Sequence, residues 1–473
     1  MIRRRLAAGV AAVVLAGSIA SGAVGLAQAP PRPGSEGIGD PYFPKDGNGG
    51  YDVGHYDIRD TFRMSDSRLT GTTKLTARAL HPLSRFNLDL VLRPTSVKVN
   101  GTKAKFRKTS LRELQVTPAK PLWKGQSFTV EVAYVGYPSK IKWGSEQPFL
   151  ANRHEALALN EPHSGAWWFA ANEHPRDKAT FDVKITAPKD RQVVSNGTLA
   201  SRQTVGNQTT WRWRGAGKMA TYLAFFAVGS YNIKSGTSNG LPYTLAVSRR
   251  LSKSQQDESM ALLKRTPAVV KWLTKQLGPY PFKSTGGLTT GFSPGFALET
   301  QTRPVYQYWG GPEEVYVVVH EQAHQWFGNS VSVRNWRDIW LNEGFATFME
   351  ARYNEGHGGP TAQRWMLNLY NALPASDVFW DVKVARPGAG RIFDQAIYFR
   401  GAMTVQALRH RIGNADFTRL VRTWLRQKAN ANGSVASFQQ LAENVSGERL
   451  DGFFRAWLYS SDKPAKTKAN GLR

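Results

Sequence analysis

The residues best suited to metal chemistry lie in the run HEQAH at residues 320–324. Pro312 ahead of this run and Gly328 behind it predict the first turn and the end of a helix, because Pro suits an opening turn and Gly the position after the last one. On that helix His320 and His324 are one turn apart on one face, about 6 Å along the axis. Two imidazoles in this arrangement can bind one divalent ion.

Three glutamates complete the predicted site. Glu321 lies beside the histidine pair, where its carboxylate can take a proton from an attacking water instead of binding the metal. A catalytic zinc with two histidines usually adds one carboxylate ligand, and Glu343, in WLNEGFATFME, is the candidate. The chain must reverse after His324 and begin a second helix that carries Glu343. Glu350 follows on the same face of this second helix, where it either hydrogen-bonds a ligand or is an ordinary solvent carboxylate.

The elements that must hold these residues fall into two halves. From Tyr51 to about Tyr231, short alternating runs such as TTKLTARAL, FTVEVAYVG, ATFDVKITAP and MATYLAFFAVG predict a mainly β half. After the turn-like SGTSNG the period becomes helical, in QQDESMALLKRTPAVVKWLTKQL, IWLNEGFATFMEARYN and AIYFRGAMTVQALRHRI. We therefore predict a β domain at 51–240, a catalytic domain at 241–464 and a basic tail at 465–473 that frays.

The N-terminal residues have the layout of a secretory signal peptide. Arginines at 3–5 precede an uncharged run rich in Ala, Val and Leu, which ends in an A-x-A pattern at 27–29. An uncleaved membrane anchor is the alternative, because residues 6–29 are about long enough to span a bilayer. The small residues near the A-x-A pattern favour a cleaved signal peptide at 1–29, followed by a Pro- and Gly-rich linker at 30–50. We expect a secreted protein.

Composition and charge limit the chemistry and the partners. The 473 residues include no cysteine, which excludes disulfides, thiolate ligands and a Cys nucleophile, so any metal must be bound by His and carboxylates. The formal charge of +27 at pH 7 draws the protein to anionic surfaces such as a cell envelope. We expect non-specific association with an anionic envelope and no specific nucleic-acid site, since a solvated basic face and export account for the charge.

Several segments resemble the M1 (gluzincin) family of zinc aminopeptidases. HEQAHQWFGN followed by WLNEGFA resembles the family pattern of HExxH, eighteen intervening residues and Glu. Similar segments are LGPYPF at 277–282, GFALET at 295–300 and NEPHSGAWWFAANEHPRDKATF at 160–181. The resemblance covers the chain from about Tyr51 to Pro464.

The resemblance implies roles for three more residues. Tyr398, in IYFRGAM, matches the family tyrosine that hydrogen-bonds the oxyanion of the tetrahedral intermediate, a task for a strong neutral donor. Glu299 matches the G-x-M-E-N glutamate that binds the substrate's free α-ammonium, although this chain has FALET there. Glu161 resembles a second amine-binding carboxylate from the β-rich domain. Two acids on one ammonium bring only the first peptide bond to the metal, which implies an exopeptidase.

The fold that the resemblance implies is α+β, with an N-terminal β-sandwich or saddle domain followed by a thermolysin-like, mainly helical zinc peptidase domain. The implied activity is hydrolysis of the N-terminal bond of peptides with a free N-terminus, with one Zn2+ per chain, Glu321 as general base and Tyr398 as oxyanion stabiliser. A thermolysin-like endopeptidase is one alternative, but it has no use for Glu161 and Glu299. A basic envelope- or polyanion-binding protein with a vestigial zinc site is the other.

Overall fold

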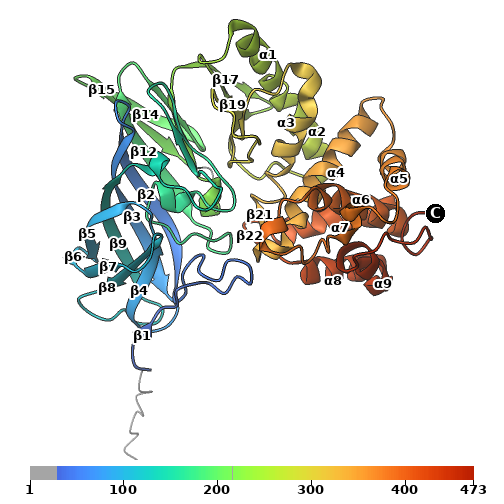
Figure 1. The fold of residues 1–473 in the computed structure, drawn as a ribbon, viewed down its shortest axis with the longest axis horizontal. Helices are drawn as coiled ribbons and strands as arrows, with labels where there is room; N and C mark the ends of the chain where they lie inside the picture. The colour runs from blue at the N-terminus through green and yellow to red at the C-terminus, as the bar shows by residue number, and fades with distance from the viewer. Residues whose placement is uncertain (1–28, 216) are drawn as a thin grey trace, which may run out of the picture. The chain divides into compact units, whose positions relative to one another are not determined.

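The fold is taken from a computed structural model, which describes residues 29–215 and 217–473 (Figure 1). The predicted signal peptide, and the alternative of an uncleaved anchor, lie outside these residues except for Ala29. In the described ranges, no helix has both the length and the apolar character needed to cross a bilayer. Contacts group residues 31–473 into one unit, and the domain boundaries predicted within it stay predictions.

Alternation of apolar and polar residues builds one large sheet in the first half of the chain. In the strand at 180–188, Phe181, Val183 and Ile185 are buried, while the residues between them are half-buried. The order of strands in this sheet is β14 (Thr198–Val205), β15 (Gln208–Arg214), β12 (Thr180–Pro188), β2 (Tyr51–Arg63), β3 (Arg68–Ala79), β9 (Ser127–Gly136), β5 (Arg93–Val99) and β6 (Thr102–Lys103). Only the β12 and β2 neighbours are parallel among these pairs.

Two smaller sheets share the core of the large one. The first has the order β1 (Arg32–Pro33), β4 (Leu83–Asp89), β8 (Glu113–Thr117) and β7 (Lys105–Lys108). The second has the order β10 (Phe149–Ala151), β11 (Ala156–Ala158), β16 (Phe226–Gly229) and β13 (Gln192–Ser195). The rings of Phe86 and Phe128 lie 5.5 Å apart, and those of Phe62 and Phe149 lie 5.8 Å apart, so each small sheet packs on the large one through aromatic pairs. The first half is β-rich, as predicted.

A hairpin opens the second half. Strands β17 (Tyr231–Ser238) and β18 (Leu241–Ser248) are antiparallel, and β19 (Thr285–Thr289) and β20 (Val305–Tyr306) extend the sheet in parallel. Asn239 and Gly240 form the tip with φ of +49° and +77°, a conformation that the Asn-Gly pair favours. The predicted domain boundary at 240 therefore coincides with the tip of a hairpin.

Helices make up most of the second half, and Figure 1 shows those from α3 onward in yellow to red. Their bounds are α1 (Lys253–Leu263), α2 (Thr266–Leu277), α3 (Val315–Ala323), α4 (Trp340–Gly356), α5 (Ala362–Ala372), α6 (Gln395–Ile412), α7 (Asn414–Gln427), α8 (Val435–Ser446) and α9 (Asp451–Phe454). A short parallel pair, β21 (Val331–Val333) and β22 (Ala431–Gly433), joins the connection between α3 and α4 to the later chain. The helical second half confirms the predicted α+β class.

Two predicted elements differ in detail from the structure. The run at 255–277, whose period is helical, forms parts of two helices, α1 and α2, because Pro267 occupies the first turn of α2 and cannot continue a preceding helix. The run MATYLAFFAVG is only partly a strand, since a 3-10 turn at Thr221–Leu223 precedes β16. This turn places Tyr222 at the predicted active site.

The C-terminal residues 465–473, which the sequence predicts to fray, are docked on the helices. Leu472 is only 2% exposed, and the indole of Trp457 donates a hydrogen bond to the carbonyl oxygen of Asn470 at 3.1 Å. The prediction of a frayed tail is wrong, because one apolar side chain and a backbone acceptor hold a segment whose basic composition suggested solvent.

The Pro- and Gly-rich segment at 34–50 is also packed. Asp46 and Asp40 are buried, and Nε2 of His163 lies 2.7 Å from Oδ2 of Asp46. The backbone amide of Trp336, far along the chain, donates to Asp40 at 2.9 Å. Buried carboxylates with partners hold this segment against the rest of the protein.

The buried His163 gives a prediction for stability. Burial alone lowers its pKa, but hydrogen bonds to Asp46 and to Glu146, 3.1 Å away, raise the pKa to about 9. Because this pKa is above the unfolded value, the stabilisation is complete below about pH 6.5 and is lost as the pH rises through about 9. We expect the free energy of unfolding to fall by up to about 3 kcal/mol between pH 6.5 and 9 from this group.

Urea denaturation at pH 6.5 and pH 9 measures this contribution. In the variant His163→Gln, the free energy of unfolding should change less between the two pH values than in the wild type. The control is His55→Gln, which removes a histidine bonded to the Thr180 hydroxyl instead of to carboxylates. An equal pH dependence in wild type and His163→Gln would contradict the prediction.

Candidate metal centre and active site

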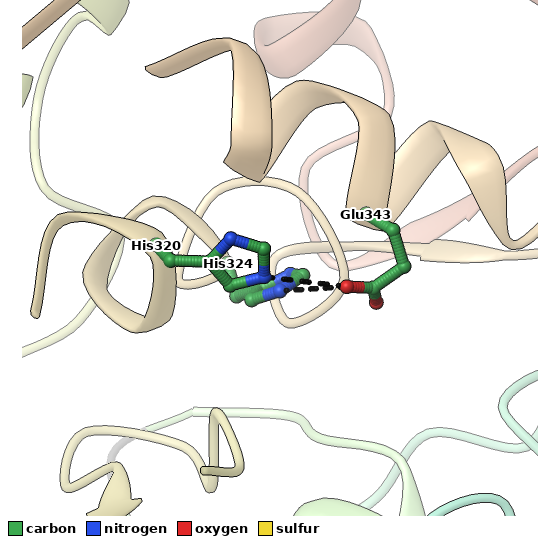
Figure 2. Close-up of side chains that lie close together, drawn as sticks. All are labelled: His320, His324 and Glu343. Atoms are coloured by element: carbon green, nitrogen blue, oxygen red, sulfur yellow. Dashed lines mark hydrogen bonds and ion pairs between the residues drawn. The ribbon is translucent and has the colours of Figure 1, made fainter. Parts of the chain in front are cut away.

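Two histidines from one helix and a glutamate from the next converge on one point. Figure 2 shows the imidazoles of His320 and His324 and the carboxylate of Glu343 pointing toward one another. Nε2 of His320 and Nε2 of His324 lie 3.3 Å and 3.4 Å from the same Glu343 oxygen, Oε2. One ligand atom from each residue lies within 4.8 Å of the other two. The structure thus brings the three predicted metal ligands together.

The helix that carries the histidines is shorter than the sequence predicts. It follows a 3-10 turn at Pro312–Glu314 and ends at Ala323. His324 keeps a helical backbone, and its amide donates to the carbonyl of His320 at 3.2 Å, so the two histidines are still one turn apart. Gly328, with φ of +115°, then reverses the chain toward α4.

Hydrogen bonds on the outer side of each imidazole fix its orientation. Nδ1 of His320 lies 2.6 Å from Oε1 of Glu350, and Nδ1 of His324 donates to the carbonyl oxygen of Phe327 at 3.0 Å. Both Nε2 atoms are therefore left to face Glu343. Such outer partners set the tautomer and the direction of a metal-binding histidine. Of the two interpretations of Glu350 that the sequence allows, the structure supports the first, since it places Glu350 against a ligand.

Close packing of α4 on α6 brings Tyr398 to the site. Gly344, directly after Glu343, faces Gly401, and a Cβ on Gly344 would lie 2.8 Å from the backbone carbon of Gly401. The approach of the two helices therefore requires glycine at this position. The ring of Tyr398 stacks on that of His320, with centroids 6.1 Å apart and an angle of 27°. Burial and the surrounding carboxylates raise the Tyr398 pKa well above its usual value, so the phenol stays a neutral donor.

Glu321 lies beside the converging ligands. Its carboxylate, together with Glu299 and His324, forms a second group whose potential ligand atoms lie within 4.8 Å of one another. Burial raises the Glu321 pKa to about 8, and repulsion from Glu299 and Glu343 adds to this, although the two histidines oppose it. A carboxylate with a raised affinity for protons, placed next to metal ligands, suits a general base.

Glu299 and Glu161 meet around one tyrosine. The Tyr222 hydroxyl donates to Oε1 of Glu299 at 2.9 Å, and it also interacts with Glu161. In the described part of the chain, the buried Oε1 of Glu161 has no hydrogen-bond partner. Burial, followed by repulsion from nearby carboxylates, raises the pKa of Glu161 well above its usual value and raises that of Glu299 as well. This pair is suited to a cationic ligand.

Sequence reasoning missed three residues that hold Glu299 in place. They are Tyr222, which bonds its carboxylate, and two side chains from the QWFGN turn, Gln325 and Asn329, which bond its backbone. Nδ2 of Asn329 donates to the carbonyl oxygen of Glu299 at 2.7 Å, and Nε2 of Gln325 donates to it at 3.2 Å. Oε1 of Gln325 also accepts from the amide of Thr302 at 2.8 Å. Gln325 and Asn329 are polar residues that flank Trp and Phe in this turn, and this contrast in the sequence could have identified them as hydrogen-bonding residues.

Residues of the FALET sequence around Glu299 form hydrogen bonds within the loop that carries this glutamate. Leu298 exchanges two backbone hydrogen bonds with Val305, of 2.9 Å and 2.8 Å. The Thr300 hydroxyl donates to the carbonyl oxygen of Arg303 at 2.7 Å. These bonds fold the loop back on itself, so Glu299 is held although the residues around it differ from the family motif.

The donor set and its charge fit a zinc ion. Two imidazoles and one carboxylate, without thiolates, are a common set for catalytic zinc. The Glu343 carboxylate is buried, but the adjacent histidines lower its pKa to about 2, so it is ionised at neutral pH. Glu161, Glu299 and Glu321 add more buried carboxylates close by. A cation bound here would favour the ionised form of these carboxylates, whose pKa values are raised without one.

Comparisons with known proteins agree with this geometry. The family model for the peptidase M1 N-terminal domain matches residues 54–223, and the model for the peptidase family M1 domain matches residues 311–457. The crystal structure of an M1 zinc metallopeptidase variant from Deinococcus radiodurans, bound to a Tyr-Ser-Ala substrate, is 26% identical with a TM-score of 0.81. That match covers 91% of this chain and 100% of the other.

Other relatives are longer or carry other ligands. A two-domain M1 zinc metallopeptidase variant bound to L-tryptophan is 27% identical with a TM-score of 0.80, over 89% of this chain and 97% of the other. The leucyl aminopeptidase of Saccharolobus solfataricus is 24% identical over 64% of this chain and 40% of its own length. The chain spans about two fifths of the length of the first curated relatives that it matches.

Proposed function

Because the chain belongs to the M1 peptidase family, we propose that it is a zinc-dependent aminopeptidase that removes the first residue from peptides with a free N-terminus. One observation carries this proposal. The ligand atoms of Glu299, Glu321 and His324 lie within 4.8 Å of one another, which joins the predicted amine anchor to the predicted base and a metal ligand. A peptide whose α-ammonium is held at Glu299 therefore presents its first peptide bond to the metal and the base.

The metal ligands in this proposal are His320, His324 and Glu343, which hold one Zn2+ per chain. When bound, the ion supplies a Lewis acid that polarises the scissile carbonyl and acidifies water. Glu350 and the Phe327 carbonyl keep both imidazoles directed at the ion through their Nδ1 atoms.

Glu321 moves the proton. It takes a proton from the attacking water as the water oxygen bonds to the carbonyl carbon, and it returns that proton to the departing amine as the C–N bond breaks. Its position beside the proposed metal ligands supports this role.

Recognition of the amine makes the enzyme an exopeptidase. Glu299 and Glu161 face a common position beside Tyr222, and the buried Oε1 of Glu161 is available for a donor. A substrate ammonium has three N–H donors and a positive charge that favours the ionised form of both carboxylates. An N-acetylated peptide offers neither a charge nor enough donors, so the site disfavours it.

Tyr398 is proposed to donate a hydrogen bond to the oxyanion. We expect Tyr398→Phe to lower kcat by about 10²–10³-fold with little change in KM, because one donor aimed at charge formed in the transition state is lost. Steady-state kinetics on an aminoacyl substrate measure both constants. The control is Tyr316→Phe, which changes an exposed tyrosine at the start of the same helix as His320. A wild-type kcat in Tyr398→Phe would refute the role.

The function is tested with a panel of fluorogenic aminoacyl substrates and an N-acetylated peptide of several residues. Since similar structures hold Tyr-Ser-Ala, L-tryptophan and L-arginine, the panel includes Tyr, Trp and Arg as the first residue. We expect cleavage of the aminoacyl substrates, loss of activity with a chelator and recovery with Zn2+. Rapid internal cleavage of the N-acetylated peptide would instead show an endopeptidase.

We also propose that the protein is exported and associates with the cell envelope. The residues at 3–29 favour a secreted protein with a cleaved signal peptide, and the net positive charge favours weak, salt-sensitive retention on an anionic cell envelope. Fractionation of the producing cells, together with a salt wash of the envelope, tests both. A protein that stays in the cytoplasm would contradict export.

A further inference from the structure

We propose that Lys178 is a positioning residue that couples the metal site to the amine site. It lies just before β12 and is only 5% exposed. Its Nζ donates to the backbone carbonyl oxygens of Asn329 at 2.7 Å and Ser330 at 2.9 Å. A buried cation is costly, and neutral carbonyls compensate it less than a carboxylate would. Burial, with a further contribution from Lys218, lowers the pKa of Lys178 to about 7.

Asn329, which Lys178 contacts, bonds to both parts of the site. Its backbone amide donates to the carbonyl oxygen of His324, a proposed metal ligand, at 3.0 Å. Its side-chain amide donates to the carbonyl oxygen of Glu299, a proposed amine anchor, at 2.7 Å. The position of Asn329 therefore contributes, together with Gln325, to the spacing between the amine anchor and the metal ligand. Asn329 is itself fully buried, so it has little freedom to adjust.

Arg176, two residues before Lys178, also joins the β-rich half to the connection between α3 and α4. Arg176 donates to the carbonyl oxygen of Arg334 at 3.2 Å and also to the side chain of Asn335. Of the two, only Lys178 reaches the end of the connection that touches His324 and Glu299. Arg176 therefore provides a comparison for general docking of the two halves.

The inference rests on the proposed function and concerns the spacing within that site. An aminopeptidase must hold the substrate amine at a fixed distance and orientation relative to the metal and the base. A substrate that is misplaced by about 1 Å can react about 10²-fold more slowly. Without the lysine, the buried carbonyls of Asn329 and Ser330 lose this donor, which removes one restraint on the position of Asn329. The imidazoles keep their own partners, Glu350 and the Phe327 carbonyl. Loss of Lys178 should therefore affect amine recognition more than zinc binding.

The test compares Lys178→Met with two matched variants. Lys108→Met removes another lysine that donates to two backbone carbonyls, those of Leu90 and Leu111, away from the site. Arg176→Met removes the neighbouring contact between the β-rich half and the same connection. We expect Lys178→Met to raise KM for aminoacyl substrates at least tenfold, while the zinc Kd, measured by competition with a chromophoric chelator, changes less than threefold. Lys108→Met and Arg176→Met should keep KM within threefold.

A second variant covers the case in which Lys178→Met does not fold. Asn329→Ala removes the amide that holds Glu299, and it should raise KM in the same way. An unchanged KM in either variant of an active enzyme, or an equal rise in Lys108→Met, would overturn the role of Lys178 and leave the proposed function standing. A wild-type protein that binds zinc but cleaves no aminoacyl substrate would overturn both.

Discussion

Replacing Glu321 by Gln is expected to lower kcat by about 10²–10⁴-fold while the zinc content stays at one ion per chain. Gln has nearly the same shape, but its amide cannot accept a proton from water. The carboxylate of Glu321 lies beside the ligand set of His320, His324 and Glu343 without completing it, so its loss should leave metal binding intact. Steady-state kinetics and elemental analysis of the same preparation measure both quantities.

The matched control for this variant is Glu314→Gln, an exposed residue that directly precedes α3. It makes the same chemical change close to the site and should keep wild-type kcat and zinc content. Full activity in Glu321→Gln would show that another group transfers the proton. A loss of zinc in Glu321→Gln would instead show that Glu321 helps to bind the metal.

Replacing His324 by Ala is expected to remove measurable activity and to weaken zinc binding by more than about 100-fold. The expected loss exceeds the 10–100-fold that is typical when an outer hydrogen-bond partner is removed. His324 is 2% exposed, and its Nε2 faces Glu343, so its removal leaves one imidazole and one carboxylate of the proposed ligand set. Zinc Kd values from chelator competition and rates on an aminoacyl substrate measure the effect.

Glu350→Gln is the comparison for His324→Ala, because we expect it to lower zinc affinity by a smaller factor. It keeps all three ligands but weakens the 2.6 Å contact to Nδ1 of His320, so zinc affinity should fall by about 10–100-fold. The expected order of zinc affinity is wild type, Glu350→Gln, then His324→Ala. Wild-type zinc affinity in His324→Ala would remove this histidine from the metal site.

The metal ligands could be predicted because local spacing determines most of their geometry. One helical turn separates His320 from His324, and this relation survives although α3 ends earlier than predicted. Spacing alone does not place Glu343 beside the histidines, since its position depends on how the chain reverses after Gly328. The type of element was also predictable, because the periods of strands and helices differ.

The supporting residues could not be predicted because their contacts are distant in the sequence. Tyr222 comes from a 3-10 turn in the β-rich half and meets Glu299 across 77 residues. Lys178 meets Asn329 across 151 residues. Neither contact can be inferred from periodicity or from a motif that the sequence displays, since each depends on how the two halves pack.

Composition did not predict that the segments near the two ends of the described chain are packed against the rest of the protein. The segment at 34–50 is rich in Pro and Gly, yet buried Asp40 and Asp46 hold it through specific partners. The last residues are basic, yet Leu472 is buried. In both places a few buried side chains determine the structure, and average polarity does not reveal them.

The most direct test of the metal site is anomalous diffraction at the zinc absorption edge from crystals of the zinc-loaded protein. We predict one peak per chain, about 2.0–2.2 Å from Nε2 of His320, Nε2 of His324 and a carboxylate oxygen of Glu343. A peak bound by other residues, or no peak at these three side chains under saturating zinc, would contradict the proposed site and the function that depends on it.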